Sequence, residues 1–123
     1  MDKQMQNLTS SQEEILLTES FYSNTCINNI CGTCVCNDIL DFKILEKAIN
    51  FVIKNNNSFR IRIKKNINKY QQTVIDYKYE KISLVELNSK SDLKSLEKQC
   101  VNTKYDILND KLYTFSSSLY PNV

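Results

Sequence analysis

The sequence contains no histidine, and it has a single glycine and a single proline among its 123 residues. Without a histidine, these residues cannot supply an imidazole as a general base or as a zinc ligand. The lone glycine, Gly32, excludes the glycine-rich loops that bind nucleotide phosphates, because those loops need several glycines at fixed spacing. Asparagine tolerates left-handed backbone conformations best after glycine, so we expect it at the turns.

Composition and charge argue against several classes of protein. The 16 Lys and Arg residues and the 14 Asp and Glu residues are mixed along the chain and leave a net charge of +2. The chain therefore lacks the concentrated basic face of a nucleic-acid-binding protein. No apolar run is long enough for a membrane span or a signal sequence. Five cysteines, an odd number, argue against a secreted disulfide framework, so we expect a cytoplasmic protein with reduced thiols.

Helical and strand periodicities alternate along the chain. Helices are predicted at residues 9–22, at 41–54 and from Ser89 or Ser91 to about 101, and strands at 27–37, 59–64, 70–75, 82–87 and 111–119. The segment 27–37 is apolar on both faces, which is typical of a strand in the interior of a sheet. The element order predicts an α+β fold, in which helices pack on a mostly antiparallel sheet.

Two helix starts can be located from capping residues. Thr9 is a suitable N-cap, and Gln12 stands three residues later, as a capping box requires. Asp41 is a suitable N-cap for the second helix, whose apolar residues recur at helical spacing. These local signals predict helices that begin directly after Thr9 and Asp41.

Four of the five cysteines lie between residues 26 and 36. The first three, Cys26, Cys31 and Cys34, have the C-x4-C-x2-C spacing of plant-type iron–sulfur sites. A cluster needs an open loop, whereas strand alternation would point Cys31 and Cys34 to opposite faces. The fifth, Cys100, is expected on the buried face of a helix. We therefore favour small buried apolar side chains over a metal site, and we assign no metal ligand.

Arg60 and Arg62 are expected on one face of the strand at 59–64. Together with Lys64, they would form a solvated, positively charged strand face. The alternative is that one arginine is buried in an ion pair with a carboxylate elsewhere in the chain. Spacing alone favours the solvated face.

Two other patterns resemble chemical sites but lack the partners that the chemistry needs. The serine run 116–118 has no histidine base and no lysine or carboxylate motif that could activate a serine, so it is expected to be ordinary strand or tail. Tyr77 and Tyr79 could stack on nucleic-acid bases, but without a basic field they are expected to pack across strands. No catalytic or cofactor-binding residue is therefore assigned.

Four segments resemble, in order, the start of the condensation domains of nonribosomal peptide synthetases. They are residues 8–16 (LTSSQEEIL), 24–30 (NTCINNI), 56–63 (NNSFRIRI), and 105–107 (YDI) followed by 111–113 (KLY). The first is similar to the family's first core motif, Leu-Ser/Thr-x-Ala-Gln, and the third to its second core motif, which usually ends Leu-Arg-Thr-Arg-Phe. The last resembles the Phe-Asp-Leu…Pro-Leu-x-Arg stretch that precedes the active site.

The resemblance implies the chloramphenicol-acetyltransferase-like fold, in which two lobes form a V with a tunnel between them. Domains of this family join an acyl or aminoacyl thioester on one carrier protein to an amine on another, and the carrier proteins bear phosphopantetheine. The family's catalytic motif, His-His-x-x-x-Asp-Gly, lies beyond the part that these residues match. The resemblance thus implies the N-terminal part of one lobe, with no cofactor of its own and no activity alone.

The resemblance also implies structural roles for four residues. Thr9 and Gln12 match the first core motif, and Arg60 and Arg62 match the second. Arg62 corresponds to the family arginine thought to pair with the aspartate of the catalytic motif, so the resemblance favours a structural over a catalytic role. The sequence departs from the family where Ser11 replaces the alanine before Gln12, and where asparagines replace Arg-His-Glu in the second motif.

The matches predict an N-terminal tail at residues 1–7, a partial condensation domain at 8–116 and a C-terminal tail at 117–123. The leading hypothesis is an N-terminal fragment of a condensation domain that is inactive alone. The alternative is a non-catalytic interaction module that docks on a partner chain to complete a lobe. Carrier-protein or synthetase chains are the expected partners, whereas nucleic acid and membranes are not.

We expect the purified chain to be colourless and to carry no stoichiometric iron or zinc, because cysteines that alternate between two faces cannot converge on one ion. The visible absorption spectrum and elemental analysis measure this directly. Bound iron with a visible absorption band would contradict the expectation and favour the iron–sulfur interpretation instead.

Overall fold

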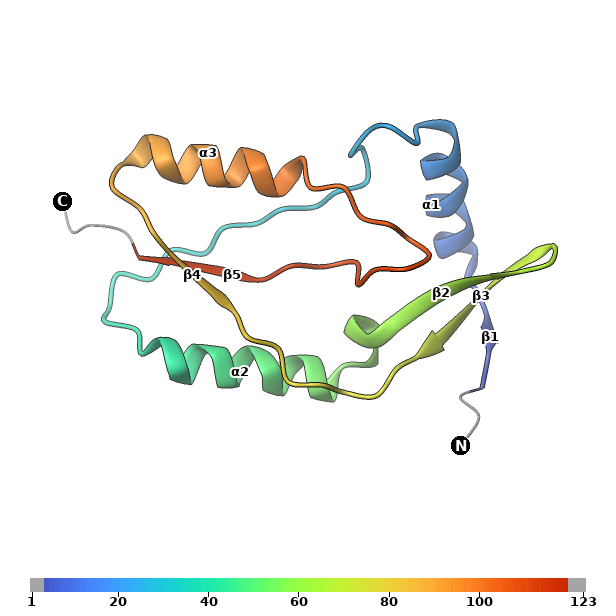
Figure 1. Ribbon diagram of the computed structural model, residues 1–123, viewed down its shortest axis with the longest axis horizontal. Coiled ribbons are helices and arrows are strands. Elements are labelled where there is room, and N and C mark those ends of the chain that lie inside the picture. The colour runs from blue at the N-terminus through green and yellow to red at the C-terminus, as the bar shows by residue number, and fades with distance from the viewer. Residues whose placement is uncertain (1–3, 120–123) are drawn as a thin grey trace.

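The computed structural model describes residues 4–119, and it places three α-helices and five strands in this part of the chain (Figure 1). The helices are α1 (Ser10–Phe21), α2 (Phe42–Asn55) and α3 (Lys90–Val101), with a 3-10 helix, η1 (Asn57–Arg60). The strands are β1 (Gln6–Asn7), β2 (Ile61–Asn66), β3 (Lys69–Val74), β4 (Ser83–Glu86) and β5 (Ser116–Leu119). The predicted α+β class is confirmed. No helix within residues 4–119 is both long and apolar enough to cross a membrane.

The helices begin where capping chemistry places them. The Thr9 hydroxyl accepts a hydrogen bond from the Gln12 amide at 3.3 Å, and the Gln12 side chain accepts one from the Thr9 amide at 2.8 Å. This reciprocal pair is the predicted capping box of α1. Asp41 caps α2 by accepting from two backbone amides, and Ser89, not Ser91, caps α3. All three caps satisfy amides that a helix start otherwise leaves without partners.

Two small sheets form, and they differ in strand direction. One has the order β1-β3-β2 and is antiparallel throughout, as predicted. The other pairs β4 with β5 in parallel, with Val85 opposite Ser118. The hairpin between β2 and β3 turns through Ile67 and Asn68, and Ile67 has a φ of 27°, a conformation that a β-branched residue rarely adopts.

The segment 27–37, predicted as an interior strand, forms no strand. It is extended but mostly exposed, and the Ile30 side chain is 99% exposed. It forms no backbone ladder with any strand in the part of the chain that the structure describes. Instead its side chains bind α3 and the residues just after it, as the Asn29 amide does to the carbonyls of Val101 and Thr103. The prediction was wrong because an apolar alternating pattern does not by itself supply a pairing partner.

Two further strands begin later in the structure than the sequence predicts. Residues 59 and 60, predicted as strand, belong to η1, and β2 begins at Ile61. Residues 111–115, also predicted as strand, have no ladder, and β5 begins at Ser116. The serine run therefore lies in a strand, as expected.

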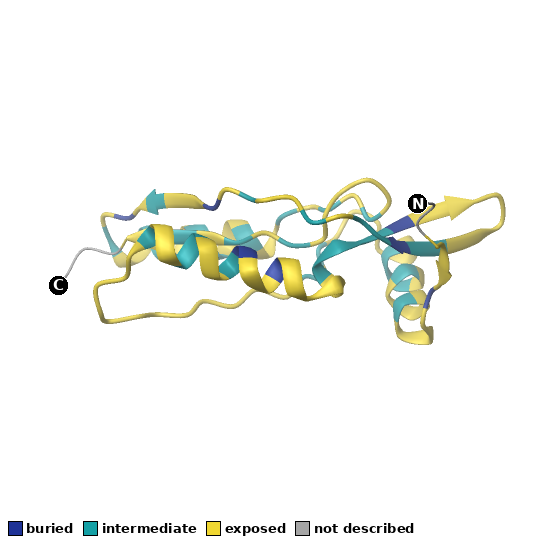
Figure 2. Ribbon diagram, turned by 90° about the horizontal axis from the view of Figure 1, so that it is seen from below, coloured by how far each residue is buried: buried dark blue, intermediate teal, exposed yellow. Residues whose placement is uncertain are grey.

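The hydrophobic core of the described residues is small. Five apolar side chains are buried: Leu8, Ile53, Ile63, Ile82 and Leu87. Neither α1 nor α3 contains a buried residue. The accessible surface is 9975 Å², whereas a compact monomer of this length exposes about 6,800 Å². Figure 2 shows the reason: the molecule is flat and elongated, and most of its ribbon is exposed.

A buried amide holds α2 to the segment that leads into β4. Asn50 is only 2% exposed, and its amide nitrogen donates to the carbonyls of Glu46 and Glu80 at 2.9 and 2.8 Å. Its side-chain oxygen accepts hydrogen bonds from the Glu80 amide at 2.8 Å and the Tyr77 hydroxyl at 3.0 Å. Every hydrogen-bonding position that this amide offers to its surroundings is thus used.

One turn earlier on α2, Glu46 makes a second set of bonds to the same segment. Its carboxylate accepts from the Ile82 amide at 2.8 Å and from the Tyr79 hydroxyl at 2.7 Å, and these bonds lower the pKa of Glu46. The residues around Tyr77 and Tyr79 form no strand. The predicted cross-strand packing of Tyr77 and Tyr79 was therefore wrong, because both hydroxyls bind the helix instead.

We expect Asn50→Ala to lower the free energy of unfolding by about 3 kcal/mol, because it leaves the partly buried backbone amide and carbonyl of Glu80 without these partners. Asn55→Ala is the matched control: Asn55 lies on the same helix, is exposed, and binds only the Phe51 carbonyl. We expect the control to change stability by less than about 0.5 kcal/mol. Urea unfolding followed by circular dichroism measures both. Equal losses in the two variants would contradict the role assigned to Asn50.

Candidate functional site

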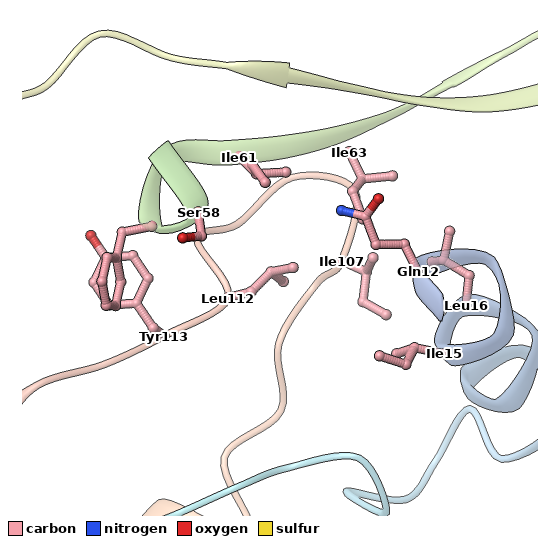
Figure 3. A pocket seen from close by; sticks show the side chains of 10 residues that line it. Gln12, Ile15, Leu16, Ser58, Ile61, Ile63, Ile107, Leu112 and Tyr113 are labelled. Atoms are coloured by element: carbon pink, nitrogen blue, oxygen red, sulfur yellow. The ribbon is translucent and has the colours of Figure 1, made fainter. Parts of the chain in front are cut away.

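An open apolar cavity of about 410 Å³ lies between α1, β2 and the segment before β5 (Figure 3). We call it the apolar cleft. It is lined by Gln12, Ile15, Leu16, Ser58, Phe59, Ile61, Ile63, Ile107, Leu112 and Tyr113. Side chains from three separate parts of the chain thus meet at one surface, and most of them are aliphatic. The cleft can take up an apolar group.

The polar groups of the apolar cleft are few. The Gln12 amide nitrogen donates to the Gln72 side-chain oxygen at 2.8 Å, so Gln12 joins α1 to β3. The Tyr113 hydroxyl is engaged with Glu80, outside the cleft lining. None of the lining residues is a carboxylate, an amine, a guanidinium or a thiol. The lining therefore offers binding surface and no pair of groups for acid–base or nucleophilic chemistry.

Beside the cleft lies an electrostatic cluster centred on Glu80. Lys111 Nζ lies 2.7 Å from one carboxylate oxygen of Glu80, and the Tyr113 hydroxyl donates to the other. Burial alone would raise the pKa of Glu80, but the two hydrogen bonds and the charges of Lys111 and Arg62 outweigh it, so this pKa lies below its usual value. Burial and the bond to Glu80 raise the pKa of Tyr113. Glu80 is thus an ionised carboxylate bound by two donors, and Tyr113 is a neutral hydroxyl that donates a hydrogen bond to it.

The structure brings Arg60 and Arg62 together at a second, smaller cavity of about 130 Å³. Arg60 donates to the Ile75 carbonyl at 3.0 Å and to the Asn57 side chain at 2.6 Å, while its Nε is buried without a partner. Arg62 donates to the Ile61 carbonyl at 2.8 Å. Both arginines are half-buried. The solvated face favoured by spacing does not form, because Arg60 lies in η1 and only Arg62 lies in β2.

Three aromatic rings pack together beside the two cavities. Phe59, Tyr113 and Phe115 pack with ring centroids 5.2 to 5.8 Å apart, in edge-on or tilted contact. Phe59 and Tyr113 line both cavities. Such contacts contribute about 0.5–1.5 kcal/mol per pair beyond the burial of apolar area. The rings fix the segment before β5 against η1 and thereby hold one wall of the apolar cleft.

The cysteines are more exposed than predicted. Cys31, Cys34 and Cys36 are exposed, and Cys26 and Cys100 are half-buried. The interpretation as buried apolar side chains was therefore wrong for Cys31, Cys34 and Cys36, because the strand that would have buried them is absent. Among residues 4–119, no three cysteine, aspartate or glutamate side chains come together in a way that could hold a metal ion.

Sequence reasoning missed the residues that organise this region, namely Glu80, Tyr113 and Asn50. Tyr113 stands in a segment that resembles the family, yet nothing in its local pattern indicates a carboxylate partner. Glu80 is 33 residues away along the chain. A short alternation of tyrosines and charged residues at 77–81 was the one available signal, and it was interpreted as cross-strand packing.

Comparison with known proteins shows a likeness to a synthetase sequence and a likeness to a solved condensation domain, whereas no protein-family model matches the chain. Over 59 residues the chain is 37% identical to surfactin synthase subunit 1 of Bacillus subtilis (strain 168), which is 46% of this chain and 2% of that protein. The fold of this chain is similar to that in the crystal structure of the starter condensation domain of rhizomide synthetase, with a TM-score of 0.84 and 14% sequence identity. That likeness covers 93% of this chain and 27% of the other. The predicted resemblance to a condensation-domain fragment is confirmed.

We expect Tyr113→Phe to lower the free energy of unfolding by about 1.5 kcal/mol at neutral pH, since it removes a hydrogen bond to the charged Glu80. The folded-state pKa of Glu80 is lowered from 4.5, so its stabilisation is present above that pH and is lost as the pH falls through the folded-state pKa. The cost of the substitution should therefore shrink in acid. Urea titrations at a series of pH values measure this.

Tyr105→Phe is the control for that substitution. The Tyr105 hydroxyl donates to the neutral Thr114 hydroxyl at 3.2 Å and is exposed. The control should cost less than Tyr113→Phe at neutral pH, and its cost should not follow the titration of Glu80. A pH-independent cost of Tyr113→Phe would show that the Glu80 bond is not what the tyrosine contributes.

Proposed function

We propose that this chain, whose fold is similar to that of a solved condensation domain, is scaffold from the N-terminal part of the first lobe of such a domain and is inactive alone. The observation that carries the proposal is the fold likeness, which spans 93% of this chain but only 27% of the solved condensation-domain chain. For the parent system we propose the family reaction, amide-bond formation between a carrier-bound thioester and an amine.

The scaffold role is supported by the chemistry that the residues can offer. The 123 residues include no histidine. The apolar cleft has no acid–base pair in its lining, and the nearby Glu80 is held by Lys111 and Tyr113. A carboxylate whose pKa is lowered by two donors is a poor general base near neutral pH. These groups are suited to stabilising the fold, not to catalysis.

The residues that match the core motifs are proposed to be structural. Thr9 and Gln12 form the start of α1, and Gln12 also connects it to β3. Arg60 binds backbone and side-chain oxygens around η1, and the charge of Arg62 helps to keep Glu80 ionised. We keep the proposed partial domain at residues 8–116, although β1 pairs just before these bounds and β5 continues past them to Leu119.

An interaction module is the second candidate, and one observation favours it. The chain exposes far more surface than a compact monomer of its length, and the apolar cleft is open. Exposed apolar surface of this extent is typical of a surface that another polypeptide covers. In this candidate a carrier-protein or synthetase chain in the cytoplasm docks on the module and completes the lobe.

Two measurements on the purified chain test the proposal. Incubated with an acyl-loaded and an aminoacyl-loaded carrier protein, the chain should form no amide product above the rate without protein, and product formation would contradict the scaffold role. The chain should also bind a hydrophobic dye such as ANS and self-associate in sedimentation experiments. A monomeric chain that does not bind the dye would contradict the proposal that the chain is part of an incomplete lobe.

A further mixing experiment separates the two candidates. The remainder of a condensation domain, produced separately, is added to the chain, and dye fluorescence and amide formation are followed. A fall in fluorescence with a gain of activity supports the fragment. A fall in fluorescence without activity supports the interaction module, and no change in either contradicts both.

A further inference from the structure

The extended segment after α1 lies along α3 in a defined register. Near one end of the contact, the Asn29 amide donates to the carbonyls of Val101 and Thr103 at 2.8 and 2.6 Å. Further along, the Thr33 hydroxyl donates to the Glu97 carboxylate at 2.7 Å. Residue numbers rise along one segment as they fall along the other, so the two run in opposite directions. Figure 1 shows the segment passing beside α3.

This register places two thiols opposite each other. Cys31 lies midway between Asn29 and Thr33, and Cys100 lies between Glu97 and Val101, the residues that those two side chains bind. After burial, the neighbouring Cys31 also helps to raise the pKa of Cys100. The flanking hydrogen bonds and this influence indicate the same pair, although 68 residues separate the two cysteines in the sequence.

The surroundings allow the two sulfurs to come closer. A disulfide needs the two sulfurs to lie about 2.05 Å apart. Gly32, next to Cys31, has nothing within 4 Å of the place where a Cβ would stand, so there is open space beside the backbone at this point. Cys31 is exposed and Cys100 is half-buried, and both are free thiols in this structure.

We propose that Cys31 and Cys100 form a reversible disulfide that fastens the extended segment to α3 under oxidising conditions. The oxidant is a small disulfide such as oxidised glutathione. The exposed Cys31 thiolate attacks it, forming a mixed disulfide and releasing one glutathione thiolate. The Cys100 thiolate then attacks the Cys31 sulfur and releases the second. In total the protein loses two protons and two electrons, and one oxidised glutathione becomes two reduced glutathiones.

The second step is expected to set the rate. Burial, together with the neighbouring Cys31, raises the pKa of Cys100 above its ordinary value of 9.0, so little of it is thiolate at neutral pH. Ring closure should therefore accelerate about tenfold for each pH unit between 7 and 9. Once formed, the bond closes a long loop and should raise the melting temperature by several degrees.

The test uses the full chain, incubated with oxidised glutathione and mapped by mass spectrometry after proteolysis without reduction. We expect a Cys31–Cys100 linked peptide within a monomer, and its loss when reduced glutathione is added in excess. In Cys100→Ser the mixed disulfide at Cys31 should persist and no linked peptide should form.

Cys34→Ser is the matched control, because Cys34 is an exposed thiol three residues further along the same segment. It should leave both the linkage and its rate unchanged. A predominant bond between other cysteines, a predominant bond between two chains, or glutathione adducts without closure in the unsubstituted chain would overturn the proposal. Because Cys31 is exposed, Cys31→Ser gives a folded reference in which the rise in melting temperature on oxidation must vanish.

Discussion

The arrangement of this chain depends on how α2 is tied to the residues that follow the antiparallel sheet. The Asn50 amide and the Glu46 carboxylate, one turn apart, hold the backbone from Glu80 to Ile82. That backbone carries the Glu80 side chain to Lys111 and Tyr113. Tyr113 in turn packs edge-on against Phe59 and forms part of one wall of the apolar cleft. The hydrogen bonds of Asn50 and Glu46 thus help to position the aromatic rings, and these rings position one wall of the apolar cleft.

Polar contacts matter here because the hydrophobic core is so small. Five buried apolar side chains cannot fix the relative positions of three helices and two sheets by packing alone. Directional hydrogen bonds and the Lys111–Glu80 ion pair supply the missing geometric definition. The exposed apolar surface that remains is consistent with scaffold that is completed by further polypeptide, as we propose. Of the two thiols in the proposed disulfide, Cys31 lies on the extended segment and Cys100 lies on α3, beside which that segment runs.

Prediction from sequence succeeded where the physical cause is local. The caps at Thr9, Asp41 and Ser89 act within four residues, and α2 follows the spacing of its apolar residues. It failed at residues 27–37, because a strand exists only when another strand supplies its hydrogen bonds, and here none does. It failed for Tyr77 and Tyr79 for a related reason: their hydroxyls find partners on α2, which no alternation pattern indicates.

The helix starts, the α+β class, the resemblance to condensation domains and the absence of any histidine for catalysis follow from the sequence alone. The pairs of distant groups do not: Asn50 binds Glu80, Glu80 binds Tyr113, and Cys31 lies opposite Cys100 because of the tertiary fold. The physical reason is the range of the interactions. Caps and periodicity act within a few residues along the chain, whereas these pairs are separated by 30 or more and become neighbours only when the helices and sheets have taken their places.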